Sequence, residues 1–199
     1  MKPEKGYKVH TVFNLTSNPK LIIFDLDGTL VRPFGSDLLP GVAEWFDGYL
    51  NKLPTWNRPQ IAVATNQGGV GYRMHREELG ADVDAAKYPT KDEADRRVFG
   101  VVERLGLDPM LVYISYAYRF SQGYWADIPI QHVLDPRWGP SWRKPNPGML
   151  LQALADTGLA PGQALMVGDM DSDRDAAVAA GVPFQTAVQF FRYTVPVTA

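Results

Sequence analysis

Cysteine is absent from this 199-residue chain, and histidine occurs only three times. Without cysteine the protein can form neither a disulfide nor a thiolate metal site. The histidines, His10, His75 and His132, are scattered and lack the spacing of metal ligands, so we expect no zinc. The lack of cysteine also agrees with a reducing cytoplasm, which is the localisation we expect.

Long apolar runs and a strong net charge are missing as well. No apolar stretch approaches the ~18 residues of a membrane span, and residues 1–20 lack the apolar core of an export signal. The formal net charge is only −2, whereas proteins that coat nucleic acid non-specifically usually carry a large basic excess. We therefore expect a soluble protein that has no membrane partner; the sequence leaves its oligomeric state open.

Short apolar runs alternate with segments of helical character along the chain. Buried strands are predicted at residues 21–25, 61–64, 111–116 and 164–168. Helices are predicted after Pro40, after Thr90, after Pro147 and in the segment DAAVAAG that ends at Gly181. This alternation predicts an α/β fold, a Rossmann-like three-layer sandwich with a central, mainly parallel sheet. No linker or repeat divides the chain, so we expect one domain over residues 1–199 with a core at about 20–190.

The run LIIFDLDGTL, residues 21–30, ends an apolar strand on two carboxylates. In an extended segment, side chains two positions apart point the same way, so Asp25 and Asp27 share one face. Two like charges this close are unfavourable unless a cation neutralises them or one of them holds a proton. Either arrangement suits an enzyme that attacks phosphate.

Three further segments supply parts of a phosphate site: Thr65-Asn66-Gln67, then Lys144, then the acidic stretch GDMDSD at residues 168–173. With the first run, they resemble in type and order the motifs of the haloacid dehalogenase (HAD) superfamily of phosphohydrolases. The resemblance covers about residues 20–185 and implies a phosphatase, a phosphoric monoester hydrolase that uses Mg²⁺.

The resemblance also implies a role for each matched residue. Asp25 would attack phosphorus and form an aspartyl-phosphate, while Asp27 would protonate the leaving oxygen and later activate water. Thr65 and the Asn66 backbone N–H would bind the phosphoryl group, and Lys144 would offset negative charge. The Asp25 carboxylate, the Asp27 carbonyl and Asp169 would bind Mg²⁺. Asp173 would fix Lys144 or a metal-bound water, and Arg143 would bind substrate.

Within the superfamily, the strings TNQGGVGY and RKPNPGMLLQA resemble the branch of histidinol phosphatase, heptose bisphosphate phosphatase and the phosphatase domain of polynucleotide kinase. About 35 residues separate the first motif from Thr65, which leaves no room for a large cap domain at that point. The cysteine-rich zinc loop of the sugar- and histidinol-phosphate members is replaced here by a segment dense in Tyr, Trp and Arg. We interpret the GGVG at residues 68–71 as a flexible turn beside the phosphate.

The aromatic segment, residues 117–143, leaves the substrate open. Aromatic side chains interleaved with arginine can stack bases and grip phosphates, which would suit the 3'-phosphate end of a nucleic acid. The same rings can instead build the small core of a long loop, and the substrate would then be a small phosphorylated metabolite. Two other hypotheses keep the fold but change the activity: a binding module without turnover, and a phosphotransferase that uses the same residues.

Overall fold

A five-stranded sheet forms the centre of the structure. The computed structural model describes residues 18–191. Its strands are β1 Leu21–Phe24, β2 Gln60–Asn66, β3 Val112–Ser115, β4 Ala164–Gly168 and β5 Phe184–Thr186. They lie in the order β3-β2-β1-β4-β5, and every pairing between them is parallel. The four predicted strands are present with ends shifted by at most a few residues, whereas β5 was not predicted.

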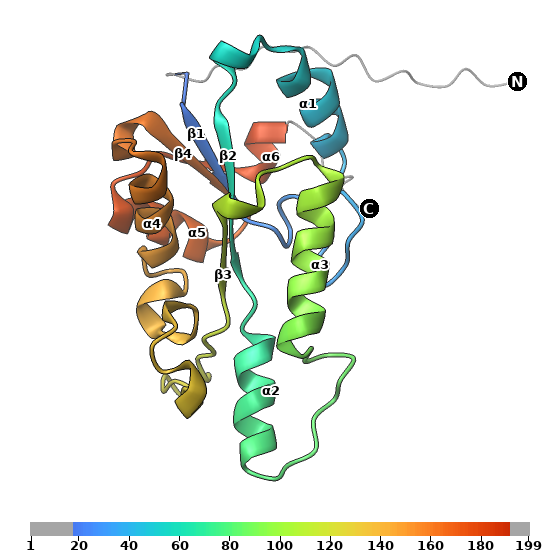
Figure 1. The fold of residues 1–199 in the computed structure, drawn as a ribbon, viewed down its shortest axis with the longest axis vertical. Helices are drawn as coiled ribbons and strands as arrows, with labels where there is room; N and C mark the ends of the chain where they lie inside the picture. The colour runs from blue at the N-terminus through green and yellow to red at the C-terminus, as the bar shows by residue number, and fades with distance from the viewer. Residues whose placement is uncertain (1–17, 192–199) are drawn as a thin grey trace, which may run out of the picture.

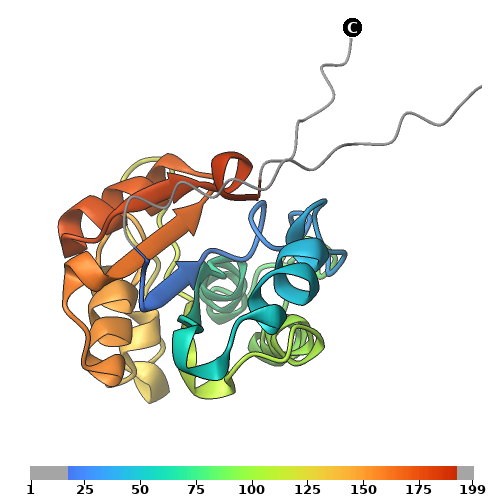
Figure 2. The same ribbon diagram turned by 90° about the horizontal axis from the view of Figure 1, so that it is seen from above.

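Helices cover both faces of this sheet (Figures 1 and 2). They are α1 Val42–Gly48, α2 Gly69–Glu78, α3 Lys91–Arg104, α4 Gly148–Thr157, α5 Asp171–Ala180 and α6 Ala187–Phe191. Helices α4 and α5 pack on one face, and α1, α3 and α6 pack on the other. The predicted three-layer α/β sandwich with a parallel sheet is therefore confirmed.

The alternation of side chains along β1 separates the two cores. Ile22 and Phe24 enter the core shared with α1, α3 and α6, while Leu21 and Ile23 enter the core shared with α4 and α5. All four are buried, as expected for a central strand that is covered on both faces. The Phe24 ring lies 5.3 Å from that of Phe190 between centroids, so α6 closes the first core.

The connection between β1 and β2 is short. It contains only α1 and two 3₁₀ turns, Leu50–Lys52 and Thr55–Asn57. No cap domain is inserted between β1 and β2, in agreement with the prediction. The β1–β2 connection therefore places no domain over the carboxyl ends of β1 and β4.

The prediction of a flexible turn at residues 68–71 is wrong. Gly69 and Gly71 belong to the first turn of α2, which lies beyond the carboxyl end of β2 (Figure 1). A Cβ atom on Gly71 would be 2.2 Å from the Tyr116 carbonyl oxygen, so the glycine allows the helix to approach the backbone that follows β3. Close packing explains this glycine, and the need for a turn does not.

Helix α5 begins at Asp171, four residues before the segment DAAVAAG in which the sequence predicted it. The acidic stretch after β4 therefore continues into the first turn of a helix, where carboxylates are favoured by the helix dipole. Among residues 18–191, no helix has the length and apolar character that a membrane crossing needs.

Candidate active site

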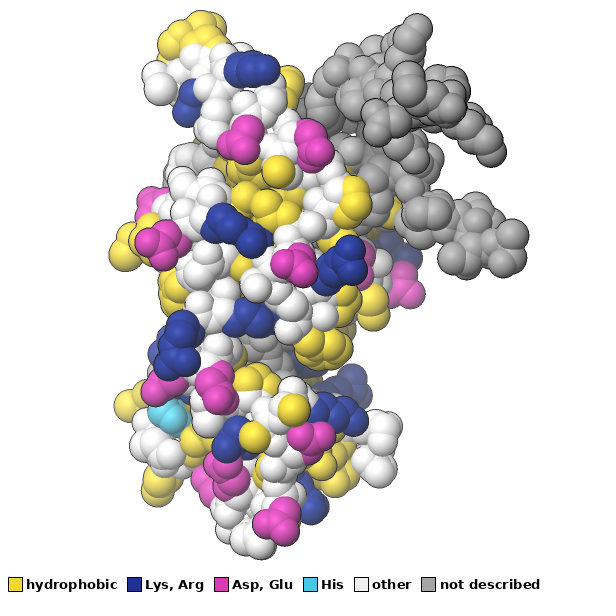
Figure 3. All heavy atoms as spheres, turned by 90° about the vertical axis from the view of Figure 1, so that its right-hand side faces the viewer, with side chains coloured by type: hydrophobic (Ala, Val, Ile, Leu, Met, Phe, Trp, Pro, Cys, Tyr) yellow, Lys and Arg dark blue, Asp and Glu magenta, His cyan; other side chains and the backbone are white. Residues whose placement is uncertain are grey.

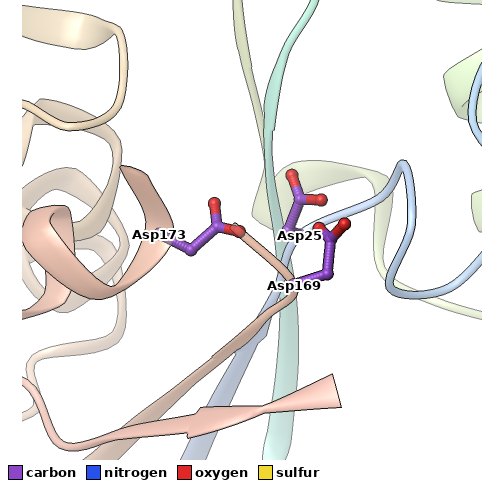
Figure 4. Close-up of side chains that lie close together, drawn as sticks. All are labelled: Asp25, Asp169 and Asp173. Carbon is purple, nitrogen blue, oxygen red and sulfur yellow. The ribbon is translucent and has the colours of Figure 1, made fainter. Parts of the chain in front are cut away.

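Three carboxylates meet at the carboxyl ends of β1 and β4 (Figure 4). Asp25 follows β1, Asp169 follows β4, and Asp173 lies in the first turn of α5. One oxygen of each lies within 4.8 Å of one oxygen of the others. Because β1 and β4 are paired neighbours, residues that follow them are held side by side.

Lys144 places its ammonium group among these carboxylates. Its Nζ lies 2.6 Å from Asp25 Oδ1 and 2.6 Å from Asp173 Oδ1, and it donates to the Ala64 carbonyl oxygen at 2.7 Å. The side chain is only 1% exposed. Asn66 fixes the lysine backbone, because its Nδ2 donates to the Lys144 carbonyl at 3.0 Å and its Oδ1 accepts from the Lys144 N–H at 3.1 Å.

The electrostatics of this group follow from burial and from an excess of negative charge. Burial raises the pKa of Asp25 to about 7, a rise that Asp173 and Asp169 reinforce and that Lys144 opposes. Burial, together with Asp173, also raises the pKa of Asp169. The pKa of Lys144 is raised as well, since Asp25 and Asp173 outweigh the cost of burying its charge. Three carboxylates thus share one ammonium group, which favours a further cation.

The donor set fits Mg²⁺, which prefers oxygen ligands and few carboxylates. Gly28, with φ +82°, makes room for Asp169, because a Cβ atom there would lie 2.2 Å from Asp169 Oδ2. Both oxygens of Asp173 are already engaged: Oδ1 contacts Lys144, and Oδ2 accepts from the Met170 N–H at 3.0 Å. Asp25 and Asp169 are therefore the carboxylates best placed to hold the cation, with Asp173 fixing the lysine.

Asp27 lies apart from this group, although only one residue separates it from Asp25. Its Oδ1 and Oδ2 each accept from Arg97, both at 2.7 Å, and Oδ2 also accepts from Gln67 Nε2 at 2.9 Å. Burial opposes ionisation of Asp27, but these hydrogen bonds outweigh it and lower its pKa. The metal ligand that the resemblance implies at this position is the backbone carbonyl of Asp27, not its carboxylate.

Thr65 and Gln67 connect the two parts of the site. Thr65, near the end of β2, is 1% exposed. Its Oγ1 accepts from Gln67 Nε2 at 2.8 Å, which leaves the threonine hydroxyl hydrogen free to donate to a ligand. The same Nε2 donates to Asp27, so one amide group orients both the threonine and the carboxylate.

Arg143 is a partly buried guanidinium whose side chain donates a hydrogen bond to a neutral acceptor. Its Nη1 donates to the Ala117 carbonyl oxygen at 3.0 Å, and a Cβ atom on Gly68 would lie 2.6 Å from that nitrogen. Burial lowers the pKa of Arg143. Among residues 18–191, no carboxylate lies within ion-pair distance of it. It therefore remains available to an anionic ligand.

Most rings of the aromatic segment are engaged inside the protein. Trp138 is 3% exposed, with its ring 5.1 Å from Tyr116 and stacked on His132 at 4.5 Å between centroids. Trp142 Nε1 donates to the Ile114 carbonyl oxygen at 3.0 Å. Trp138 is therefore buried and Trp142 is partly buried against the core of α4 and α5, whereas Tyr124 and many other residues of the segment are exposed.

The outer part of this segment packs on α2. Phe120 stacks on Tyr124 at 4.5 Å between centroids, and it also contacts His75 of α2 at 5.3 Å. Tyr118 lies 5.0 Å from Tyr72, also on α2. These contacts explain why a long irregular segment needs so many aromatic residues.

Two residues that contact Asp27, Arg97 and Gln67, were given no role from the sequence. Gln67 was part of the Thr65-Asn66-Gln67 segment but received no role. Arg97 carried a readable signal: on α3 it lies three residues after buried Ala94 and four before buried Val101, so it shares the inward face. A lone arginine on an apolar helix face indicates a buried partner.

Comparison with known proteins agrees with this geometry. The profile of a family described as HAD-hydrolase-like matches residues 141–186. A phosphoglycolate phosphatase of Pseudomonas syringae pv. tomato is 29% identical over 191 residues, covering 82% of this chain and 67% of the relative. One of Pseudomonas savastanoi pv. phaseolicola is 28% identical over 194 residues, with the same coverage of 82% and 67%.

Two solved structures share the fold. D,D-heptose 1,7-bisphosphate phosphatase from B. bronchiseptica, complexed with magnesium and phosphate, has a TM-score of 0.52 and 20% identity, covering 83% of this chain and 78% of that one. A HAD-like phosphatase from Mesorhizobium loti has a TM-score of 0.53 and 25% identity, covering 82% of this chain and 69% of that one.

Proposed function

We propose that this chain, a phosphatase of the HAD superfamily, hydrolyses a small phosphorylated metabolite in the presence of Mg²⁺ and through a phosphorylated Asp25. One observation carries the proposal: Asp25 is buried at the end of β1, 2.6 Å from the Lys144 ammonium and beside Asp169. We further propose that residues 20–190 act as one catalytic domain.

The first half of the reaction forms a bond between Asp25 and phosphorus. An oxygen of the Asp25 carboxylate attacks the phosphoryl group, the bond to the leaving oxygen breaks, and Asp27 delivers a proton to that oxygen. Thr65 donates its hydroxyl to a phosphoryl oxygen, helped by the Asn66 backbone N–H, and Lys144 offsets the charge on the nucleophile. Mg²⁺, held by Asp25, Asp169 and the Asp27 carbonyl, would neutralise developing negative charge.

The second half returns Asp25 to its starting state. Asp27 accepts a proton from a water molecule, the water oxygen attacks phosphorus, and the bond between Asp25 and phosphorus breaks to release phosphate. The ionised Asp27 that Arg97 and Gln67 maintain is suited to this step, because a base must begin without its proton. The proton that Asp27 takes from water here is the one that it delivers to the leaving oxygen in the next turnover.

Arg143 supports a choice among small phosphate esters. A guanidinium with no carboxylate partner next to Lys144 suits a metabolite that carries a second anionic group. Two of the related proteins are named for such compounds: phosphoglycolate, which contains a carboxylate, and heptose bisphosphate, which contains a second phosphate. We therefore favour small phosphate esters with a second anion.

Within residues 18–191, the packing of Trp138 and Trp142 argues against a nucleic-acid substrate. The two tryptophans that were candidates for base stacking are engaged internally, Trp138 by burial and Trp142 by its hydrogen bond to Ile114. On the face shown in Figure 3, basic and acidic side chains are interspersed, without the basic stripe that tracks a phosphate backbone.

The decisive experiment measures phosphate release with Mg²⁺ from 2-phosphoglycolate, a sugar bisphosphate, a sugar monophosphate, histidinol phosphate and a 3'-phosphorylated oligonucleotide. We expect turnover of the doubly anionic metabolites, none by Asp25→Asn, and a phosphorylated protein that is trapped by rapid quenching. The control is Asp171→Asn, because Asp171 is close in sequence but 84% exposed.

Each contrary result points to a different alternative. Full activity of Asp25→Asn would rule out the covalent mechanism. Transfer of the phosphoryl group to added glycerol in preference to water would make the protein a phosphotransferase. Binding of phosphate esters without turnover would make it a binding module, and preference for the oligonucleotide would restore the nucleic-acid hypothesis.

A further inference from the structure

Arg97 of α3 joins three segments of the chain that are distant in sequence. Its Nη1 donates to Asp27 Oδ1 at 2.7 Å and to the Gly35 carbonyl oxygen at 2.9 Å. Its Nη2 donates to Asp27 Oδ2 at 2.7 Å and to Gln67 Oε1 at 2.9 Å. Each of these two nitrogens carries two hydrogens, so all four are used, and the side chain is only 20% exposed.

The acceptor positions of Asp27 are filled in the same way. A carboxylate offers about four lone-pair positions. Besides the two bonds from Arg97, Asp27 Oδ2 accepts from Gln67 Nε2 at 2.9 Å, and Oδ1 accepts from the Phe34 N–H at 3.0 Å. Each of these four positions faces a donor, so this structure holds the carboxylate in the arrangement of the water step, in which Asp27 accepts.

The backbone conformation at Phe34 directs its N–H at Asp27. Phe34 is the only non-glycine residue with a positive φ, 61°, among residues 18–191, and its N–H is the one that reaches Asp27. Left-handed backbone in a bulky residue is unfavourable unless the surroundings enforce it. Arg104, about two helix turns beyond Arg97 on α3, donates to the Ser36 carbonyl oxygen and provides a second tie to the same segment.

We propose that Arg97 is a positioning residue for the water step: it orients Asp27 as the acceptor for the water molecule that hydrolyses phosphorylated Asp25. This inference rests on the proposed function. If a water molecule takes the place of one of the four donors and directs its own O–H at Asp27, the carboxylate still accepts at every position. When Asp27 instead delivers a proton to a leaving group, the atom that faces its carboxylate at that position must be a hydrogen-bond acceptor. Arg97 therefore acts on the second half of the reaction more than on the first.

The network also limits the side effects of losing Arg97. Gln67 Nε2 still has Thr65 Oγ1 as an acceptor at 2.8 Å, and neither Asp25 nor Lys144 forms a hydrogen bond or ion pair with Arg97. The groups that bind and attack the phosphoryl group should therefore keep their arrangement when Arg97 is replaced.

The two halves can be separated with p-nitrophenyl phosphate. Nitrophenolate leaves without needing a proton, so its release in the first turnover reports formation of the phosphorylated protein, and later turnovers report its hydrolysis. In rapid-mixing experiments with Arg97→Met, we expect the first turnover to stay within about threefold of wild type. We expect later turnovers to slow by about tenfold or more, with phosphorylated protein accumulating to a larger fraction in quenched samples.

Two further variants keep the test independent of folding. Arg96→Met is the matched control, because Arg96 is the exposed neighbour on the same helix, and it should behave as wild type. Arg97→Lys retains one charged donor group without the planar fork, so we expect an intermediate rate of hydrolysis. If Arg97→Met does not fold, the lysine variant decides.

The outcomes separate this inference from the function on which it rests. If wild type releases no phosphate from any ester, the proposed function fails. If wild type is active and Asp25→Asn is not, equal slowing of both phases in Arg97→Met would assign Arg97 a purely structural role. Unchanged or faster later turnovers in that variant would equally overturn the inference.

Discussion

Two charged clusters lie on either side of the end of β1, and they balance their charges differently. The Lys144 cluster comprises Asp25, Asp169, Asp173 and Lys144, with three carboxylates and a single ammonium group. The Arg97 cluster comprises Asp27, Arg97 and Gln67, with one carboxylate and one guanidinium. The lysine side chain is 1% exposed, whereas Arg97 and Asp27 are 20% and 24% exposed.

The difference shows where a cation is needed. The Arg97 cluster is neutral and its carboxylate is saturated with donors, so it can orient a group without further help. The Lys144 cluster has an excess of negative charge, and two of its three carboxylates, those of Asp25 and Asp173, are buried, which is costly without a counter-ion; Asp169 is exposed. This excess of negative charge supports the proposed metal site beside Asp25.

The largest expected effect comes from removing the ammonium group. Lys144→Met would leave Asp25 and Asp173 buried without their partner, and loss of one partner of a buried ion pair costs about 3–5 kcal/mol. We expect the free energy of unfolding, from urea titration, to fall by about that amount. Lys91→Met, which breaks the partly exposed pair with Asp95, should cost about 1 kcal/mol or less. An equal loss of unfolding free energy in the two variants would contradict the expected difference between the buried and the partly exposed ion pair.

Mg²⁺ should stabilise the protein more at pH 8 than at pH 5. The pKa of Asp25 is raised from 3.8 to about 7, so its contribution to stability is present below about pH 4 and is lost as the pH rises to about 7. A bound cation offsets that loss, and fewer protons compete with it at pH 8. Saturating Mg²⁺, at 100 times Kd, would add about 2.7 kcal/mol, measured as a rise in Tm.

The matched variants for this metal effect are Asp169→Asn and Asp171→Asn. Asp169→Asn should remove most of the rise in Tm, whereas Asp171→Asn, which changes a side chain that is 84% exposed, should preserve it. A rise of equal size at both pH values, or one that survives Asp169→Asn, would place the cation elsewhere.

Arg143 provides a third arrangement, a guanidinium without a carboxylate. Arg143→Met should raise KM about tenfold for esters with a second anion, which corresponds to about 1.4 kcal/mol. KM for an ester with no second anion should change much less, because the phosphoryl group itself is bound by Thr65 and Lys144. A uniform increase across both classes would show that Arg143 does not contact the second anion.

The smallest effect should be the acid dependence of the Arg97 cluster. Hydrogen bonds from Arg97 lower the pKa of Asp27, so this group stabilises the fold above its unfolded pKa and loses that contribution as the pH falls. The sign is opposite to that of Asp25. In Asp27→Asn, the unfolding free energy should decrease less between pH 6 and pH 3 than in wild type. An unchanged acid dependence would show that Asp27 contributes nothing to it.

Prediction from the sequence succeeded where the signal lay within one short stretch of residues. The alternating pattern located β1 to β4, and two carboxylates two residues apart at a strand end predicted a charged site there. The pattern did not locate β5 or α6, because both are short: β5 has three residues and α6 has five. It also misread GGVG, since the reason for Gly71 is a contact with Tyr116 that no local pattern contains.

The chain itself determined the class of chemistry, because the order of the strands and the residues at their ends bring Asp25, Lys144 and Asp169 to one edge of the sheet. Only the tertiary structure decided how the remaining charges are partnered. Asp27 faces Arg97, 70 residues away, and Lys144 is held by Asn66, 78 residues away. Such partners are set by which helix packs beside which strand end, and this depends on the whole core and not on any short stretch of sequence.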